Sequence, residues 1–221
     1  IRNTVAQRPD YAGMGTTLTA VLASNDRLTL AHIGDSRAYL LSGGRLEQLT
    51  HDHTLVQSLV DEGQITEAEA LTHPRRSWIL RALDGRGSPE LDVEVIDAAP
   101  GDRLLVCSDG LSSYVEPAVI ARALAGDDPQ TAASRLVDLA LQAGGSDNIS
   151  CAVADIADDD LENRAPIIDG AIAEPDAETD LDPTTESVPS EERTSHAAPR
   201  RTRSIGRRLA IVASLVIILI A

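Results

Sequence analysis

The chain has 221 residues, and 43% of them are apolar, which suits one ordinary globular domain with room for appendages. Its formal net charge is −16, and Arg supplies all of the fixed positive charge because the sequence contains no Lys. This balance argues against a nucleic-acid-binding protein, since contacts to phosphates need clustered Lys and Arg side chains.

The first 156 residues alternate strand and helix patterns, after a polar stretch at 1–8 that resembles the end of a helix. Apolar runs predict strands over 16–23, 27–34, 37–41, 91–96, 103–108 and 149–155. Helical periodicity predicts helices over 55–62, 67–71, 116–125 and 129–143. Strands in consecutive hairpins and helices in runs indicate an α+β domain with antiparallel sheets.

Local signals support these boundaries. Asn25-Asp26 separates the first two strands like a hairpin turn. Asp128 followed by Pro129 fits a helix N-cap and first helical position. Cys107 and Cys151 lie in apolar strand-like runs, so we expect reduced core residues of a cytosolic domain rather than a disulfide framework.

Three further zones follow the globular part at 1–156. Residues 157–199 are rich in acidic residues, Pro, Ser and Thr, and we expect a disordered linker because such a segment buries little apolar surface. Residues 200–208 hold five Arg and form a basic juxtamembrane segment. Residues 209–221 are apolar and uncharged, and we interpret them as the start of a transmembrane helix.

The Arg-rich flank favours the cytoplasmic side of a membrane. We therefore expect a single-pass protein of the cell membrane with its globular domain in the cytoplasm. The alternative is that 209–221 is a buried helix or a frayed tail.

Three Asp residues stand at the ends of apolar strands beside small residues, namely Asp35, Asp109 and Asp147. Each alone could be a turn former or a cap. Together, at one rim of a sheet, their carboxylates would suit Mg²⁺ or Mn²⁺. Two such ions are the common device for hydrolysing phosphate esters. The sequence has neither the Cys and His spacing of a zinc site nor a Lys for a nucleotide-binding P-loop.

Four ordered motifs then resemble those of the protein phosphatase 2C (PPM) family: MGTTLTA at 14–20, HIGDSR at 32–37, CSDGL at 107–111 and GSDN at 145–148. The likeness extends to bacterial members that reverse Ser/Thr kinases and end in an acidic linker and a membrane helix. It implies two antiparallel β-sheets packed as a sandwich flanked by helices, with the N-terminal part missing. It also implies a monomeric, metal-dependent Ser/Thr protein phosphatase that acts on phosphorylated proteins, with Ser/Thr kinases and their substrates as partners.

By that resemblance, Asp109 and Asp147 match ligands of a binuclear Mn²⁺ or Mg²⁺ centre, and Asp35 matches a ligand of a third, weaker metal. Ser108 and Asn148 would orient these ligands. Gly110 would let the backbone turn close to the ions.

Other polar residues have simpler interpretations. We expect Thr16 and Thr17 to pack or form hydrogen bonds, and His32 to be a core histidine with its hydrogen bonds satisfied. Residues 51–53 (HDH) suggest a metal site, but a solvated turn that caps the next helix fits better. Residues 55–83 match a flap near the family's substrate entrance, where Arg75, Arg76 and Arg81 either attract a phosphopeptide or balance acidic neighbours.

The family pattern also contains an upstream Arg, an acidic residue and an Asp-Gly pair, and none has a counterpart before Ala12. We therefore expect an exposed sheet edge and an impaired catalyst. Three alternatives remain open: a non-catalytic pseudophosphatase or membrane-tethered scaffold, a phosphatase of a stress-response switch, and an adaptor whose acidic linker is functional.

Overall fold

The structure is a computed structural model that describes residues 1–24, 27–86, 88–126 and 128–157. The predictions for 158–199, for the basic segment at 200–208 and for the apolar run at 209–221 lie outside these residues. Within the described ranges, none of the helices combines the length and the apolar character that crossing a membrane requires.

One sheet has three strands, β1 (Leu18–Ser24), β2 (Arg27–Ile33) and β5 (Asp92–Asp97), in the order β1-β2-β5. All of its pairings are antiparallel. Ser24 stands opposite Arg27, which confirms the predicted hairpin between the first two strands. Among the described strands, β1 lies at an edge of this sheet, as expected.

The second sheet has four antiparallel strands in the order β4-β3-β6-β7. Its members are β3 (Arg37–Ser42), β4 (Arg45–Gln48), β6 (Arg103–Cys107) and β7 (Cys151–Asp155). Cys107 of β6 stands opposite Cys151 of β7, and both thiols are free, as the sequence predicts.

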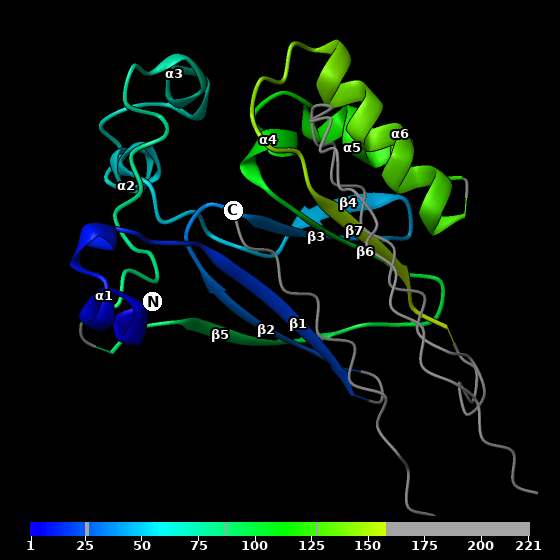
Figure 1. Cartoon of the computed structure of the whole chain (residues 1–221). Helices are drawn as coiled ribbons and strands as arrows, with labels where there is room; N and C mark the ends of the chain where they lie inside the picture. Colours follow the sequence, from blue (N-terminus) through cyan, green and yellow to red (C-terminus); the bar gives the residue numbers. More distant parts are fainter. Residues whose placement is uncertain (25–26, 87, 127, 158–221) are drawn as a thin grey trace, which may run out of the picture. The chain divides into compact units, whose positions relative to one another are not determined.

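The two sheets pack face to face, and helices cover the other face of the four-stranded sheet (Figure 1). Between the sheets lie Val21, Leu28, Leu30, Ala38, Leu40, Leu104 and Val106. On the helical side, Tyr39 and Leu105 of the sheet pack with Ile120, Leu124 and Leu136. The predicted α+β sandwich flanked by helices is confirmed.

The helices are α1 (Arg2–Gln7), η1 (Pro9–Tyr11), α2 (Leu55–Asp61), α3 (Glu67–Thr72), α4 (Asp109–Ser112), α5 (Pro117–Leu124) and α6 (Pro129–Gln142). Asp128 caps α6 by accepting from the backbone N–H groups of Gln130 and Thr131, as predicted. Thr66 and Glu69 form a capping box at α3. The short elements β4 and α4 are additional to the sequence prediction.

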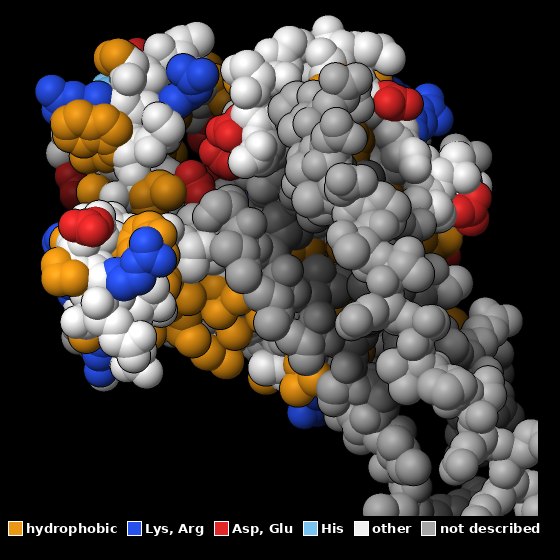
Figure 2. Space-filling view, viewed as in Figure 1, with side chains coloured by type: hydrophobic (Ala, Val, Ile, Leu, Met, Phe, Trp, Pro, Cys, Tyr) orange, Lys and Arg blue, Asp and Glu red, His pale blue; other side chains and the backbone are white. Residues whose placement is uncertain are grey.

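The outer face of the three-stranded sheet carries apolar side chains that no described helix covers. Strand alternation places Leu22, Val93 and Val95 on this face, and they are 38%, 65% and 57% exposed. Figure 2 shows the hydrophobic surface over β1 and β5.

Candidate metal centre

The strand register brings the three predicted aspartates to one end of the four-stranded sheet. Arg37 at the start of β3 stands opposite Cys107 at the end of β6, which stands opposite Cys151 at the start of β7. Asp35 precedes β3, Asp109 follows β6, and Asp147 precedes β7, so all three leave the sheet at the same rim. In Figure 2, acidic side chains gather in the space between α4 and the α2–α3 segment.

The electrostatics of these carboxyl groups reflect burial and mutual repulsion. Burial, followed by the charges of Asp109 and Asp52, raises the pKa of Asp35 to about 6. The pKa of Asp109 is also raised, first by burial and then by the charge of Asp147. Asp35 is 8% exposed, whereas Asp147 is exposed. A divalent cation placed among them would offset this repulsion.

The backbone around Asp109 is held tightly against the loop that carries Asp147. Ser108 is buried, and its hydroxyl donates to the carbonyl of Asn148 at 3.1 Å and accepts from the N–H of Ser150 at 3.1 Å. A Cβ on Gly110 would stand 2.4 Å from the Asn148 carbonyl oxygen. Gly110 is therefore required for the close approach of the two segments. Its expected role, to let the backbone turn close to the ions, stays a prediction.

The turn that carries Asp35 depends on another glycine. Gly34 has φ +114, and a Cβ there would stand 2.3 Å from Cγ2 of Thr17. Thr17 is itself buried and shares a 2.7 Å hydrogen bond with the Ser36 hydroxyl. The MGTTLTA motif thus packs under the turn through Thr17.

Gly34→Ala should lower the free energy of unfolding by more than about 2 kcal/mol, because left-handed strain and a steric clash act together. Gly44→Ala is the matched control, since Gly44 has φ +81 but nothing within 4 Å of an added Cβ, and about 1 kcal/mol is expected. Urea unfolding of both variants checks this. Equal losses of unfolding free energy in the two variants would contradict the packing of Thr17 against Gly34.

The prediction of a solvated turn at residues 51–53 is wrong. Asp52 is 8% exposed and accepts from Arg37 at 2.9 and 2.7 Å through Nε and Nη2. His53 is also buried, and the helix cap is Thr54, whose hydroxyl accepts from the N–H of Gln57. Asp52 pairs with Arg37, the last residue of the HIGDSR motif, and so helps to fix the turn beside Asp35.

His32 is a core histidine with hydrogen bonds on both ring nitrogens, as predicted. Its ring lies 2.9 Å from the Thr19 hydroxyl through Nδ1 and 3.1 Å from the His51 carbonyl through Nε2. Burial lowers its pKa, and the neighbouring His53 lowers it further. His32 is 1% exposed.

Residues 78–81, near the end of the flap, bond to the residue that begins the flap and to His53 just before it. Leu55 N–H donates to the Trp78 carbonyl, and Leu80 N–H donates to the His53 carbonyl. Arg81 pairs with Asp92 at 2.8 Å, which favours for this residue the second interpretation, that it balances an acidic neighbour. The guanidinium of Arg75 lies 4.5 Å from the ring centroid of Trp78, which is 53% exposed.

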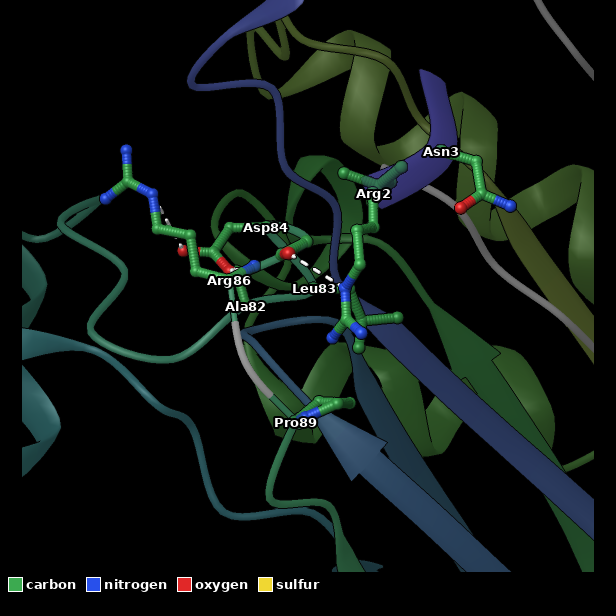
Figure 3. A pocket seen from close by; sticks show the side chains of 9 residues that line it. Arg2, Asn3, Ala82, Leu83, Asp84, Arg86 and Pro89 are labelled. Carbon is green, nitrogen blue, oxygen red and sulfur yellow. Dashed lines mark hydrogen bonds and ion pairs between the residues drawn. The ribbon is translucent and has the colours of Figure 1, made fainter. Parts of the chain in front are cut away.

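A separate hollow of about 510 Å³ lies beside α1 (Figure 3). Its lining comes from the start of the chain, the end of the flap and the residues that follow it: Ile1, Arg2, Asn3, Ala82, Leu83, Asp84, Gly85, Arg86 and Pro89. None of the three aspartates borders it. It is therefore not the predicted metal centre.

The chemistry of the acidic rim fits a hard divalent cation, because its donors are carboxylate oxygens whose charges repel one another. The side chains of Asp35, Asp109 and Asp147 do not form a complete coordination site, however. Among the described residues, no group of three or more His, Cys, Asp or Glu is arranged to hold a metal ion. The role of Asp35, Asp109 and Asp147 as ligands stays a prediction.

Comparison with known proteins identifies the family. The family model for protein phosphatase 2C matches residues 2–155. The chain belongs to the protein phosphatase 2C family. Among curated relatives, the serine/threonine protein phosphatase PstP of Mycobacterium tuberculosis (strain H37Rv) is 45% identical over 225 residues, covering 97% of this chain and 44% of the relative. The chain thus spans less than half of that protein's length.

Solved structures agree with this assignment. A crystal structure of the Mycobacterium tuberculosis serine/threonine phosphatase PstP/Ppp has a TM-score of 0.69 and 51% identity, covering 71% of this chain and 66% of that chain. The catalytic domain of PstP in complex with two manganese ions has a TM-score of 0.66 and 48% identity, covering 71% and 65%.

Proposed function

We propose that the protein containing this chain hydrolyses phosphoserine and phosphothreonine in other proteins, using two Mn²⁺ or Mg²⁺ ions. The observation that carries the proposal is the register that leads Asp35, Asp109 and Asp147 out of the sheet at one rim. The similarity to a PstP catalytic domain solved with two manganese ions supports it.

Asp109 and Asp147 would hold the binuclear centre, and Asp35 would hold a third, weaker ion. When bound, the ions would activate a water and neutralise phosphate charge. Ser108 keeps the Asp109 and Asp147 segments together by its bonds to Asn148 and Ser150. The turn at Gly34 and the Arg37–Asp52 pair set the direction in which Asp35 leaves the strand.

The partners follow from this activity. We infer that the natural protein is a monomer that acts on phosphorylated proteins, among them Ser/Thr kinases and their substrates, and so reverses bacterial kinase signalling. The apolar run at 209–221 would anchor it in the cell membrane, with the phosphatase domain in the cytoplasm.

A second candidate is a non-catalytic role as a pseudophosphatase or a membrane-tethered scaffold. It is favoured by one observation, that the described residues hold no three-residue group arranged to bind a metal. We propose accordingly that these 221 residues alone turn over little substrate.

The test is hydrolysis of a phosphothreonine peptide, measured as released phosphate with Mn²⁺ or with a chelator. The natural protein that carries this chain should show activity that requires Mn²⁺, and the 221-residue chain should show little. No Mn²⁺-dependent activity in the natural protein would favour the scaffold. Comparable turnover by the 221 residues alone would contradict their proposed impairment.

A further inference from the structure

His53 lies where three parts of the domain meet: the turn before Asp35, the segment leading to α2, and the end of the flap. Its side chain is 4% exposed, and its ring centroid lies 4.9 Å from that of His32. The ring contacts groups far apart in the sequence, namely Gly34 and Asp92. A buried imidazole with this many fixed contacts is held in one orientation.

His53 holds Gly34 by two hydrogen bonds. Its backbone N–H donates to the Gly34 carbonyl at 2.7 Å. Its ring nitrogen Nδ1 accepts from the Gly34 N–H at 3.0 Å. Both backbone polar groups of Gly34, the residue just before Asp35, are thus held by one residue.

The bond to Gly34 fixes the tautomer of the ring. Because Nδ1 accepts, the proton of the neutral imidazole sits on Nε2 and is donated to Asp92 Oδ2 at 2.8 Å. Arg81 donates through Nη2 to the other oxygen, Oδ1, at 2.8 Å. Arg81 Nη1 also lies 2.8 Å from Nε2 of His53.

Asp92 therefore joins the flap to the turn. Arg81 is the last residue of the segment 78–81, which forms backbone hydrogen bonds with His53 and Leu55. Asp92 is the first residue of strand β5. A shift of the flap end would move Arg81, then Asp92 and the ring, and the ring would carry the movement to Gly34.

We propose that His53 is a positioning residue, which fixes the direction of the Asp35 carboxylate through Gly34 and links it to the flap through Asp92 and Arg81. This rests on the proposed function, because it assigns His53 to the placement of a predicted metal ligand. It does not place His53 itself on a metal or on a substrate.

Two substitutions separate the two contacts. In His53→Asn, an amide oxygen can take the place of Nδ1 and accept from Gly34, but the side chain is too short for Asp92. In His53→Gln, the amide NH₂ can take the place of Nε2 and donate to Asp92, but the acceptor for Gly34 is lost. His51→Gln is the matched control, since the His51 side chain is exposed and bonds only to Asp61 among the described residues.

The experiment uses the natural protein that carries this chain and two measurements. Hydrogen–deuterium exchange of the segment containing Gly34 reports the bond, and electron paramagnetic resonance of free Mn²⁺ reports binding. We expect His53→Asn and His51→Gln to match the wild type in both. We expect His53→Gln to exchange faster at Gly34 and to bind the weakest class of Mn²⁺ about 10-fold less tightly, as for other residues that orient metal ligands.

Three results would overturn the positioning role of His53. Equal Mn²⁺ binding by His53→Gln and the wild type would overturn the positioning role while leaving the proposed function intact. Equal losses in His53→Asn and His53→Gln would also overturn it, because the contact to Gly34 would then not be the cause. A wild-type protein that binds no Mn²⁺ would overturn the proposed function and this role together.

Discussion

Asp109→Asn in the natural protein is expected to abolish Mn²⁺-dependent hydrolysis without lowering the stability of the metal-free domain. Loss of a partner that only orients a ligand costs roughly 10–100-fold, so loss of a proposed ligand should cost more than about 100-fold. The metal-free domain should not suffer, because Asp109 is half-buried and its pKa is raised by burial and then by Asp147. Removing the charge of Asp109 removes both the cost of burying it and the repulsion from Asp147.

The measurement pairs phosphopeptide hydrolysis with thermal unfolding in a chelator and in Mn²⁺. The wild type should be stabilised by Mn²⁺ and the variant should not, since only the native state binds the ion. Asp138→Asn on the exposed side of α6 is the control and should leave both readouts unchanged. A variant that keeps a tenth of the activity, with unchanged Mn²⁺ dependence, would rule out Asp109 as a ligand.

Asp35→Asn should stabilise the metal-free domain near neutral pH and have little effect in acid. The folded-state pKa of Asp35 is about 6, against an ordinary value of 3.8, mainly because of burial. Between these values the folded protein binds a proton that the unfolded chain does not, so stability from this group falls as the pH rises from about 4 to about 6. Above that pH window, the buried carboxylate lowers the free energy of unfolding by on the order of 2–3 kcal/mol, and Asn removes this loss.

Urea unfolding between about pH 4.5 and 8, in a chelator, checks this expectation. The difference between Asp35→Asn and the wild type should grow as the pH rises through the window. Added Mn²⁺ should reverse the order at pH 7.5, because the wild type alone keeps the carboxylate. A difference that is constant over this range would contradict the raised pKa.

The sequence contained most of the fold because its signals are local. Alternation along the strands and the Asp128-Pro129 start of α6 depend on neighbours within a few residues. The same holds for the aspartates, since each follows or precedes an apolar run that could be recognised alone. Antiparallel pairing of those runs then brings their ends together.

What could not be predicted depends on pairs distant in the chain or on very short elements. Asp52 was expected in a solvated turn, and only its partner Arg37, at the start of β3, shows why it is buried. His53 bonds to Asp92, 39 residues further along, and no local pattern marks that contact. Strand β4 (Arg45–Gln48) is polar and largely exposed, and α4 has four residues, so neither has the periodicity that identifies an element.

The apolar outer face of the three-stranded sheet has a consequence for how the chain behaves in solution. Leu22, Val93 and Val95 favour contact with a second apolar surface, whereas a net charge of −16 keeps like molecules apart. That repulsion reaches about 10 Å at 0.1 M salt but only about 3 Å at 1 M. Concentrated salt therefore removes the long-range barrier while leaving the short-range attraction, and self-association becomes favoured as ionic strength rises.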